Sequence, residues 1–255
     1  MGKTCKDCGK NLGFFSAFTS VERCEDCNER FQIEQKAVKI ESPVYIPPIQ
    51  QQAVINKPVS GSVGGKIEYY RLQEWWLNAL SSEERSILIA HYKPMGLNPD
   101  SLIHGKITSS DQSVVAFLSN LSGWVKQPEY RKIGYKLIEK AETSISNKTP
   151  VMDRHFLYQA KMEIYYRNRD MDNFALSSAI EACKQQIALS TKAKQAFMKQ
   201  WGQIPSHAGY KQLCIIMEKQ KNYDEVIHLA SEAKKQGWTG DWEKRIEKCT
   251  KKKNV

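Results

Sequence analysis

Several features that this chain lacks exclude whole classes of protein. Its longest apolar runs, such as SILIA and CIIM, are far shorter than the roughly 20 residues that a transmembrane helix needs. The first residues, MGKTCKDCGK, contain no apolar core of the kind found in secretory signals. Only 14 of the 255 residues are glycine and 9 are proline, so the chain is neither collagen-like nor broadly disordered. We therefore expect a globular protein with no membrane partner.

Recognisable catalytic motifs are also absent. None of the five histidines lies in an HExxH motif, no GxSxG sequence is present, and SGSVGGK lacks the spacing of a phosphate-binding loop. Asp170, Asp172 and Asp224 stand where turns and helix caps are expected, and aspartate is favoured there for local reasons. We therefore expect a protein that is not an enzyme.

The chain is basic, with a net charge of +10. A positive charge attracts phosphates and acidic surfaces. The lysines are spread along the chain rather than gathered in one block, apart from a short basic tail, KCTKKKNV. This distribution is typical of solvated helix faces, so charge alone does not identify a partner.

The seven cysteines fall into two groups. Cys5, Cys8, Cys24 and Cys27 form two Cys-x2-Cys pairs separated by fifteen residues, which is the spacing of a four-cysteine zinc site. Because all four ligands would come from the protein, the ion has no open position for substrate, and we expect a structural Zn²⁺. A pair of redox disulfides is the alternative.

The other three cysteines, Cys183, Cys214 and Cys249, are isolated in helix-like segments, where we expect small buried apolar side chains. The odd total, without a signal peptide, indicates a reducing compartment and hence a cytoplasmic location.

Residues 3 to about 38 resemble a zinc ribbon or treble-clef finger. Two cysteine knuckles flank a segment suited to short strands, Gly9 follows the first knuckle, and a helical pattern, NERFQIEQKAV, follows the second. A module this small cannot bury enough surface to fold alone, so metal binding must stabilise it. The resemblance implies a finger that contacts nucleic acid in some families and protein in others. We assign it residues 1–38.

Residues 39–66 differ in composition from both neighbours. Four prolines block helix formation there, and Gly61, Gly64 and Gly65 are expected to loosen the chain. We therefore predict an extended or mobile connector that joins the finger to a helical domain at residues 67–255.

Helical periodicity dominates residues 67–255, and the predicted fold is mainly α. EYYRLQEWWLNAL has apolar residues at helical spacing, and Ser81 with Glu84 forms a capping-box pattern before the next helix. Near the C-terminus, residues 209–238 are predicted to form a helix pair with small residues, Ala230 and Ala233, at the expected helix contact. This pair resembles a tetratricopeptide repeat, with Tyr210 and Tyr223 at its aromatic positions.

Two looser copies fit the same template and imply an irregular bundle or solenoid with an additional helix at about 190–202. The first copy has Phe117, Leu121, Trp124, Tyr130, Ile133 and Leu137, and the second has Leu157, Ala160, Ile164, Phe174, Ala175, Ala179 and Ala182. Residues 194–248 also resemble a repeat module of bacterial and phage proteins of unknown function, which suggests a prokaryotic or viral source.

Stacked helix pairs present a concave surface made by the first helix of each pair. Its predicted partner-binding residues are Tyr158, Met162, Tyr165, Tyr166 and Lys211, with Glu218 nearby. We expect an adaptor that binds a protein or peptide there. The alternative is a nucleic-acid-binding protein that uses finger lysines (Lys3, Lys6, Lys10), Phe14, Phe15 and the tail lysines (Lys251, Lys252, Lys253).

Overall fold

The structure is a computed structural model that describes residues 4–9, 27, 63–96 and 98–254. The chain divides into two units, Met1–Ser60 and Gly61–Val255, and each is considered by itself. The described part of the second unit, called the body below, contains eleven α-helices and no strand. The prediction of a mainly α protein is therefore confirmed. The predicted connector, apart from its last residues, lies outside the described residues.

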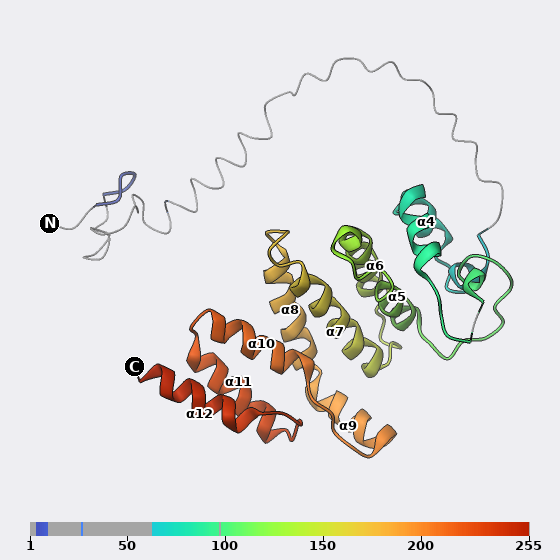
Figure 1. Ribbon diagram of the computed structural model, residues 1–255. Helices are drawn as coiled ribbons and strands as arrows, with labels where there is room; N and C mark the ends of the chain where they lie inside the picture. The colour runs from blue at the N-terminus through green and yellow to red at the C-terminus, as the bar shows by residue number, and fades with distance from the viewer. Residues whose placement is uncertain (1–3, 10–26, 28–62, 97, 255) are drawn as a thin grey trace. The chain divides into compact units, whose positions relative to one another are not determined.

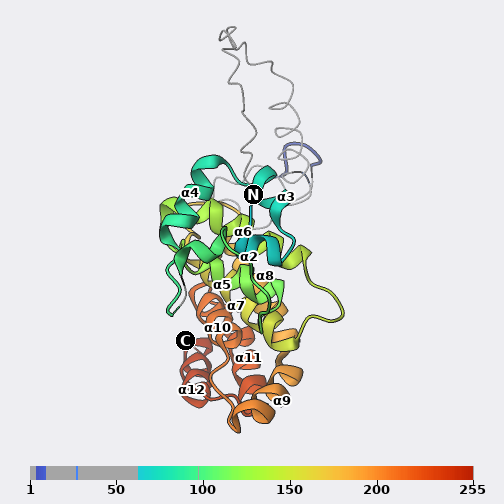
Figure 2. The same ribbon diagram turned by 90° about the vertical axis from the view of Figure 1, so that its right-hand side faces the viewer.

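The helices of the body follow chain order from one end to the other (Figures 1 and 2). At one end lie α2 (Gly65–Tyr69), α3 (Gln73–Asn78), α4 (Ser82–His91) and the 3-10 turn η2 (Pro99–Leu102). The remaining elements are α5 (Val114–Ser122), η3 (Pro128–Tyr130), α6 (Arg131–Thr143), α7 (Val151–Arg167), α8 (Ala175–Ala188), α9 (Ser190–Trp201), α10 (Ala208–Lys219), α11 (Tyr223–Lys235) and α12 (Trp242–Lys253).

The segment EYYRLQEWWLNAL is divided between two helices, although its periodicity predicted one. Arg71 takes a left-handed conformation with φ of 56°, and Leu72 N–H donates to Ile67 O (2.9 Å). The hydrogen bond from Leu72, which follows the left-handed Arg71, completes a Schellman motif, and this motif ends α2. The break lets α2 and α3 turn so that Ile67, Leu72 and Trp76 are all buried.

Gly64 and Gly65 do not loosen the chain, and that prediction is wrong. Their N–H groups donate to Ile103 O (2.9 Å) and Gly105 O (2.8 Å) in the loop after η2. Gly65 has φ of +60°, and a Cβ added there would lie 2.4 Å from Ser101 O. Glycine is needed because the two backbones approach each other closely.

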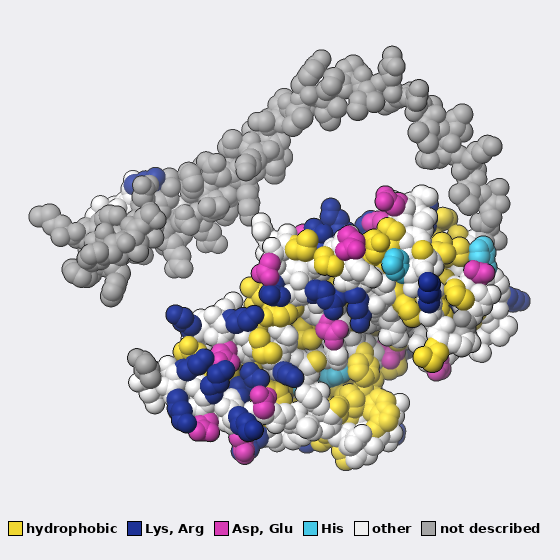
Figure 3. All heavy atoms as spheres, in the orientation of Figure 1, with side chains coloured by type: hydrophobic (Ala, Val, Ile, Leu, Met, Phe, Trp, Pro, Cys, Tyr) yellow, Lys and Arg dark blue, Asp and Glu magenta, His cyan; other side chains and the backbone are white. Residues whose placement is uncertain are grey.

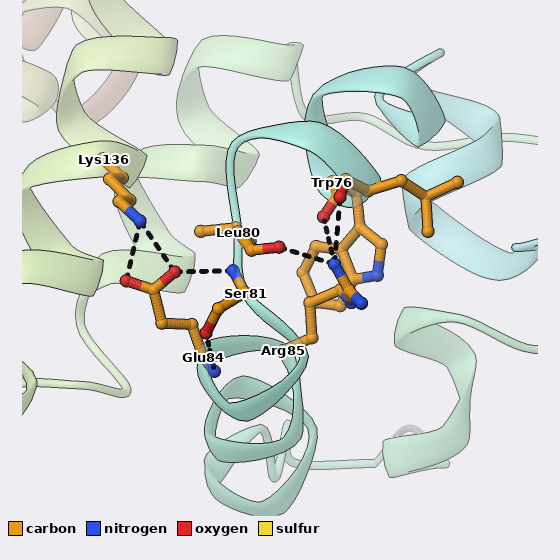
Figure 4. A network of polar contacts seen from close by, with 7 residues as sticks. Trp76, Leu80, Ser81, Glu84, Arg85 and Lys136 are labelled. Carbon is orange, nitrogen blue, oxygen red and sulfur yellow. Dashed lines mark hydrogen bonds and ion pairs between the residues drawn. The ribbon is translucent and has the colours of Figure 1, made fainter. Parts of the chain in front are cut away.

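The predicted capping box at α4 is confirmed (Figure 4). Ser81 Oγ accepts from Glu84 N–H (3.1 Å), and Ser81 N–H donates to Glu84 Oε2 (2.8 Å). Lys136 of α6 donates to the same carboxylate at 2.7 Å. Burial favours the neutral acid, but these donors outweigh it and lower the pKa of Glu84. Arg85 donates to carbonyls of residues 76, 77 and 80 at the end of α3, so one helical turn joins three helices.

From α5 onward, helices pack largely in pairs. Pairs are formed by α5 with α6, α7 with α8, and α10 with α11, and each pair also contacts the next; α12 packs on α11. In sequence, α9 comes between the second and third pairs, and it matches the predicted extra helix at 190–202. It packs against α7 and α8. Most apolar positions of the three predicted copies are buried. The helix pairs therefore follow one another along the body in the order of the sequence.

Two hydrophobic clusters form the core, and α7 contributes to both. Leu157 and Ile164 belong to the cluster built from α2 to α7. Met162 belongs to the cluster built from α7 to α12. Since the same helix supplies opposite faces to the two clusters, α7 is the central element of the body.

Glycines allow close contact where successive pairs meet. A Cβ on Gly134 of α6 would lie 2.0 Å from the Ile164 side chain of α7. A Cβ on Gly209 of α10 would lie 2.7 Å from Gln186 Oε1 and 3.0 Å from Cys183 O, both of α8. Larger residues would therefore push neighbouring pairs apart.

A buried polar junction joins α7, α8 and α10. The Gln186 amide donates to His155 O (3.1 Å) and accepts from Gly209 N–H (2.6 Å). The rings of His155 and His207 lie 5.2 Å apart, centre to centre, with Phe197 and Trp238 around them. Burial lowers the pKa of His155 to about 4, and burial together with His155 lowers that of His207 to about 3. Both rings are therefore neutral at pH 7.

Candidate functional site

Three N-terminal cysteines gather in the first unit. The sulfurs of Cys5, Cys8 and Cys27 all lie within 4.8 Å of one another. Gly9 N–H donates to Cys5 O (2.9 Å), and Gly9 has φ of +72°, a conformation that favours glycine. This turn folds Cys8 back beside Cys5. Cys27 has helical backbone conformation and completes the cluster.

The cluster fits a metal ion by its geometry and its donor chemistry. In a tetrahedral site with Zn–S bonds of about 2.3 Å, the sulfurs stand about 3.8 Å apart, which the observed limit accommodates. Cys5 is buried, Cys27 is half-buried and Cys8 is exposed. Three cysteines can therefore hold a metal ion here. The fourth predicted ligand, Cys24, lies outside the described residues.

The three cysteines of the body are all fully buried. Cys183, Cys214 and Cys249 are fully buried in the second core cluster, as predicted from their isolated positions. Burial raises the pKa of Cys183 and Cys214 to about 12 and raises that of Cys249 as well. They are therefore protonated, apolar packing residues at pH 7.

A groove of about 220 Å³ runs between α5 and α7 in the body. From α7, Phe156, Gln159, Glu163 and Arg167 line it at successive turns. Asn120 lines its other wall, from α5. This arrangement agrees with the expectation that the first helices of successive pairs share a surface, but the residues differ from those predicted.

The two ends of this α5/α7 groove differ chemically. Arg167 donates to Lys126 O (3.2 Å), which places both cations at one end, and neither is ion-paired within the described part of the chain. Glu163 lies one turn away and accepts from Gln159 Nε2 (3.0 Å). Phe156, which is 43% exposed, marks the other end.

The structure does not bring the predicted partner-binding residues onto one surface. Tyr158 packs against the first core cluster, and Tyr165 stacks on Tyr135 with ring centres 4.4 Å apart. Met162 is only 5% exposed because it faces the second cluster. Tyr166 accepts from Lys219 of α10 (3.1 Å), while Lys211 is exposed. Helical spacing located α7 correctly but could not show which of its faces other helices cover.

Glu218, expected beside Lys211 on the concave face, instead anchors α12. Its carboxylate pairs with Lys248 (2.7 Å) and Lys252 (2.9 Å), and these two lysines lower the pKa of Glu218. The basic tail is therefore folded into a helix whose charges have acidic neighbours. Lys251 pairs with Glu247 (2.7 Å) and Lys253 with Asp224 (2.5 Å).

Comparison with known proteins finds no matching family model, no matching curated protein and no matching solved structure. Among the described residues, no helix has both the length and the apolar composition needed to cross a membrane.

Proposed function

We propose that this chain is a non-enzymatic adaptor whose helical body binds a protein or peptide segment in the α5/α7 groove. The observation that carries the proposal is the groove itself, which lies between the first helices of two pairs. It combines an exposed aromatic ring with two cations, Lys126 and Arg167, that form no ion pair with the part of the chain that the structure describes. Exposed aromatics and arginines are enriched in protein interfaces. Pairwise helix contacts and an inserted helix support the resemblance to an irregular tetratricopeptide-like array.

In this proposal the N-terminal unit is a zinc ribbon or treble-clef finger. Cys5, Cys8, Cys24 and Cys27 hold one structural Zn²⁺, and the mutual proximity of Cys5, Cys8 and Cys27 supports it. The finger adds a second contact to the same assembly. Two linked contacts bind more tightly than either alone because the second becomes intramolecular.

Nucleic acid is the less favoured partner. The three tail lysines expected to contact phosphate each have an acidic neighbour, at 2.5 to 2.9 Å. Exposed ion pairs are weak, but they reduce the positive potential that attracts a phosphate backbone. Apart from Lys6, the finger residues of that alternative lie outside the described part of the chain.

The full-length chain, immobilised as bait, tests the proposal in nuclease-treated and untreated lysates of its native host. We expect the same proteins to be captured from both, with weak dependence on salt. A Gln159→Trp variant should lose them because the indole fills the groove, whereas Lys184→Glu, an exposed change on α8, should not. Capture that requires nucleic acid, or that persists in Gln159→Trp, would contradict the proposal.

A further inference from the structure

An exposed apolar patch lies beside the Phe156 end of the α5/α7 groove. Met198 and Trp201 of α9 are 45% and 48% exposed. Phe197 connects them to Phe156, since its ring centre lies 6.2 Å from that of Phe156 and 5.2 Å from that of Trp201. Figure 3 shows hydrophobic side chains gathered over the region where Figure 1 places α9. We call Phe156, Met198 and Trp201 the α9 patch.

The helix that supplies two of the three patch residues is positively charged. The helix α9 carries Lys192, Lys194 and Lys199 and no acidic residue. Lys192 and Lys199 are exposed. An apolar ligand group with acidic neighbours would therefore be attracted here, whereas a basic one would be repelled.

A fixed distance separates the α9 patch from the cationic end of the groove. Phe156 and Arg167 are eleven residues apart on the same helix, which corresponds to about 16 Å at a rise of 1.5 Å per residue. An extended peptide covers that distance with about five residues. One short peptide can therefore reach both ends.

The groove also limits where a ligand can carry negative charge. Glu163 lies between the cationic end and the α9 patch, and its carboxylate would repel an acidic group placed in the middle. A nucleic acid carries a phosphate at every nucleotide and so meets this repulsion. A peptide can place a neutral residue there, and this favours peptide over nucleic acid.

Resting on the proposed function, we propose that the ligand is an extended peptide segment with an acidic group about five residues from a large apolar side chain. The acidic group binds Lys126 and Arg167, and the apolar side chain binds the α9 patch. Neutral polar residues between them face Gln159 and Glu163. The inserted helix α9 thus supplies half of the specificity.

A random peptide display library, selected on the full-length chain, tests this inference. We expect the enriched peptides to share an acidic and a large apolar residue about five positions apart. Synthetic copies should bind at least tenfold more weakly to Arg167→Glu and to Trp201→Ala. Binding to Lys184→Glu should be unchanged. Melting curves of all variants should match the parent, so that lost binding reflects lost contacts.

Other outcomes separate this inference from the function it rests on. Peptides that bind both Arg167→Glu and Trp201→Ala normally, but not Gln159→Trp, would overturn the inference and leave the groove as a peptide site. Peptides with no shared pattern would do the same. Failure to enrich any peptide would overturn both. Displacement of the enriched peptides by a twelve-residue oligothymidylate would assign the surface to nucleic acid instead.

Discussion

The six cysteines that the structure describes lie in two contrasting environments. Cys5, Cys8 and Cys27 gather in the first unit, with Cys8 exposed. Cys183, Cys214 and Cys249 lie buried in the apolar core of the body. The same residue type is thus placed to hold a metal ion in one region and packs between helices in the other, and we expect the two regions to depend on different forces. A substitution or treatment that affects only metal binding, or only apolar packing, should therefore destabilise one region and leave the other unchanged.

The largest expected effect follows loss of the metal. Cys8→Ser removes one thiolate, and we expect it to abolish metal binding and unfold residues 3–38, because metal binding contributes on the order of 10 kcal/mol to folding. The thermal transition of the body should stay nearly unchanged. Elemental analysis and circular dichroism melting measure the two results. A body transition that shifts together with the finger would show that the two regions are not independent.

Thiol accessibility sharpens the same comparison. After chelation, a thiol reagent should modify Cys5, Cys8, Cys24 and Cys27 in the otherwise native chain. The three body cysteines should react only once urea unfolds the helices, because burial excludes the reagent and keeps them protonated. Mass spectrometry counts the modified sites. Modification of the body cysteines at the same rate would contradict the assigned environments.

The body should fail when its helix contacts are disrupted. Ala230 is completely buried in α11, and Ala230→Glu would place a charge in the second core cluster. We expect a loss of more than about 4 kcal/mol in the free energy of unfolding of the body. Ser231→Glu, an exposed neighbour, is the matched control and should cost less than about 0.5 kcal/mol. Urea denaturation measures both, and metal content should not change in either.

Acid should weaken the body through its buried histidines. The pKa values of His155 and His207, about 4 and about 3, lie below the ordinary 6.5. The unfolded chain therefore binds more protons as pH falls below 6.5, and each histidine should lower stability by about 1 kcal/mol per pH unit until its folded pKa is reached. Urea midpoints between pH 7 and 4.5 measure this slope.

Histidine variants test whether His155 and His207 cause this loss of stability at low pH. His155→Gln should flatten the slope, whereas His228→Gln, which changes an exposed histidine, should leave it unaltered. An equal slope in all three proteins would show that other groups cause the acid sensitivity.

The smallest expected effect is at the capping box. Ser81→Ala leaves Glu84 N–H without its acceptor, and an N-cap change of this kind costs about 1 kcal/mol. Ser86→Ala, within the same helix, is the control. Urea denaturation should separate the two, and similar stability in both would mean that the cap contributes nothing measurable.

Local chemistry was predictable from the sequence, and long-range placement was not. The capping box at Ser81, the buried Ala230 and Ala233, and the inserted helix follow from residue spacing and are confirmed. The functions of Gly65 and Gln186 depend on backbones far away in sequence, to which no local pattern points. Met162 shows the same limit, because helical periodicity cannot tell which of two neighbouring clusters a face meets.

The candidate groove was found only in part. Its helices were predicted from the repeat pattern, but Phe156, Gln159 and Glu163 were not singled out. One signal was available, since these residues recur every three or four positions along a helix predicted to be the first of its pair. These residues line a groove only because α5 packs beside α7, and the sequence does not show that contact.

We propose that sulfur–metal bonds hold the first region together, whereas apolar packing holds the second. Metal analysis of freshly purified protein, repeated after all four N-terminal cysteines are changed to serine, tests it most directly. We predict about one zinc ion per parent chain, none in the variant, and the same helical melting transition in both. Parent protein without bound metal, or metal retained by the variant, would contradict the account.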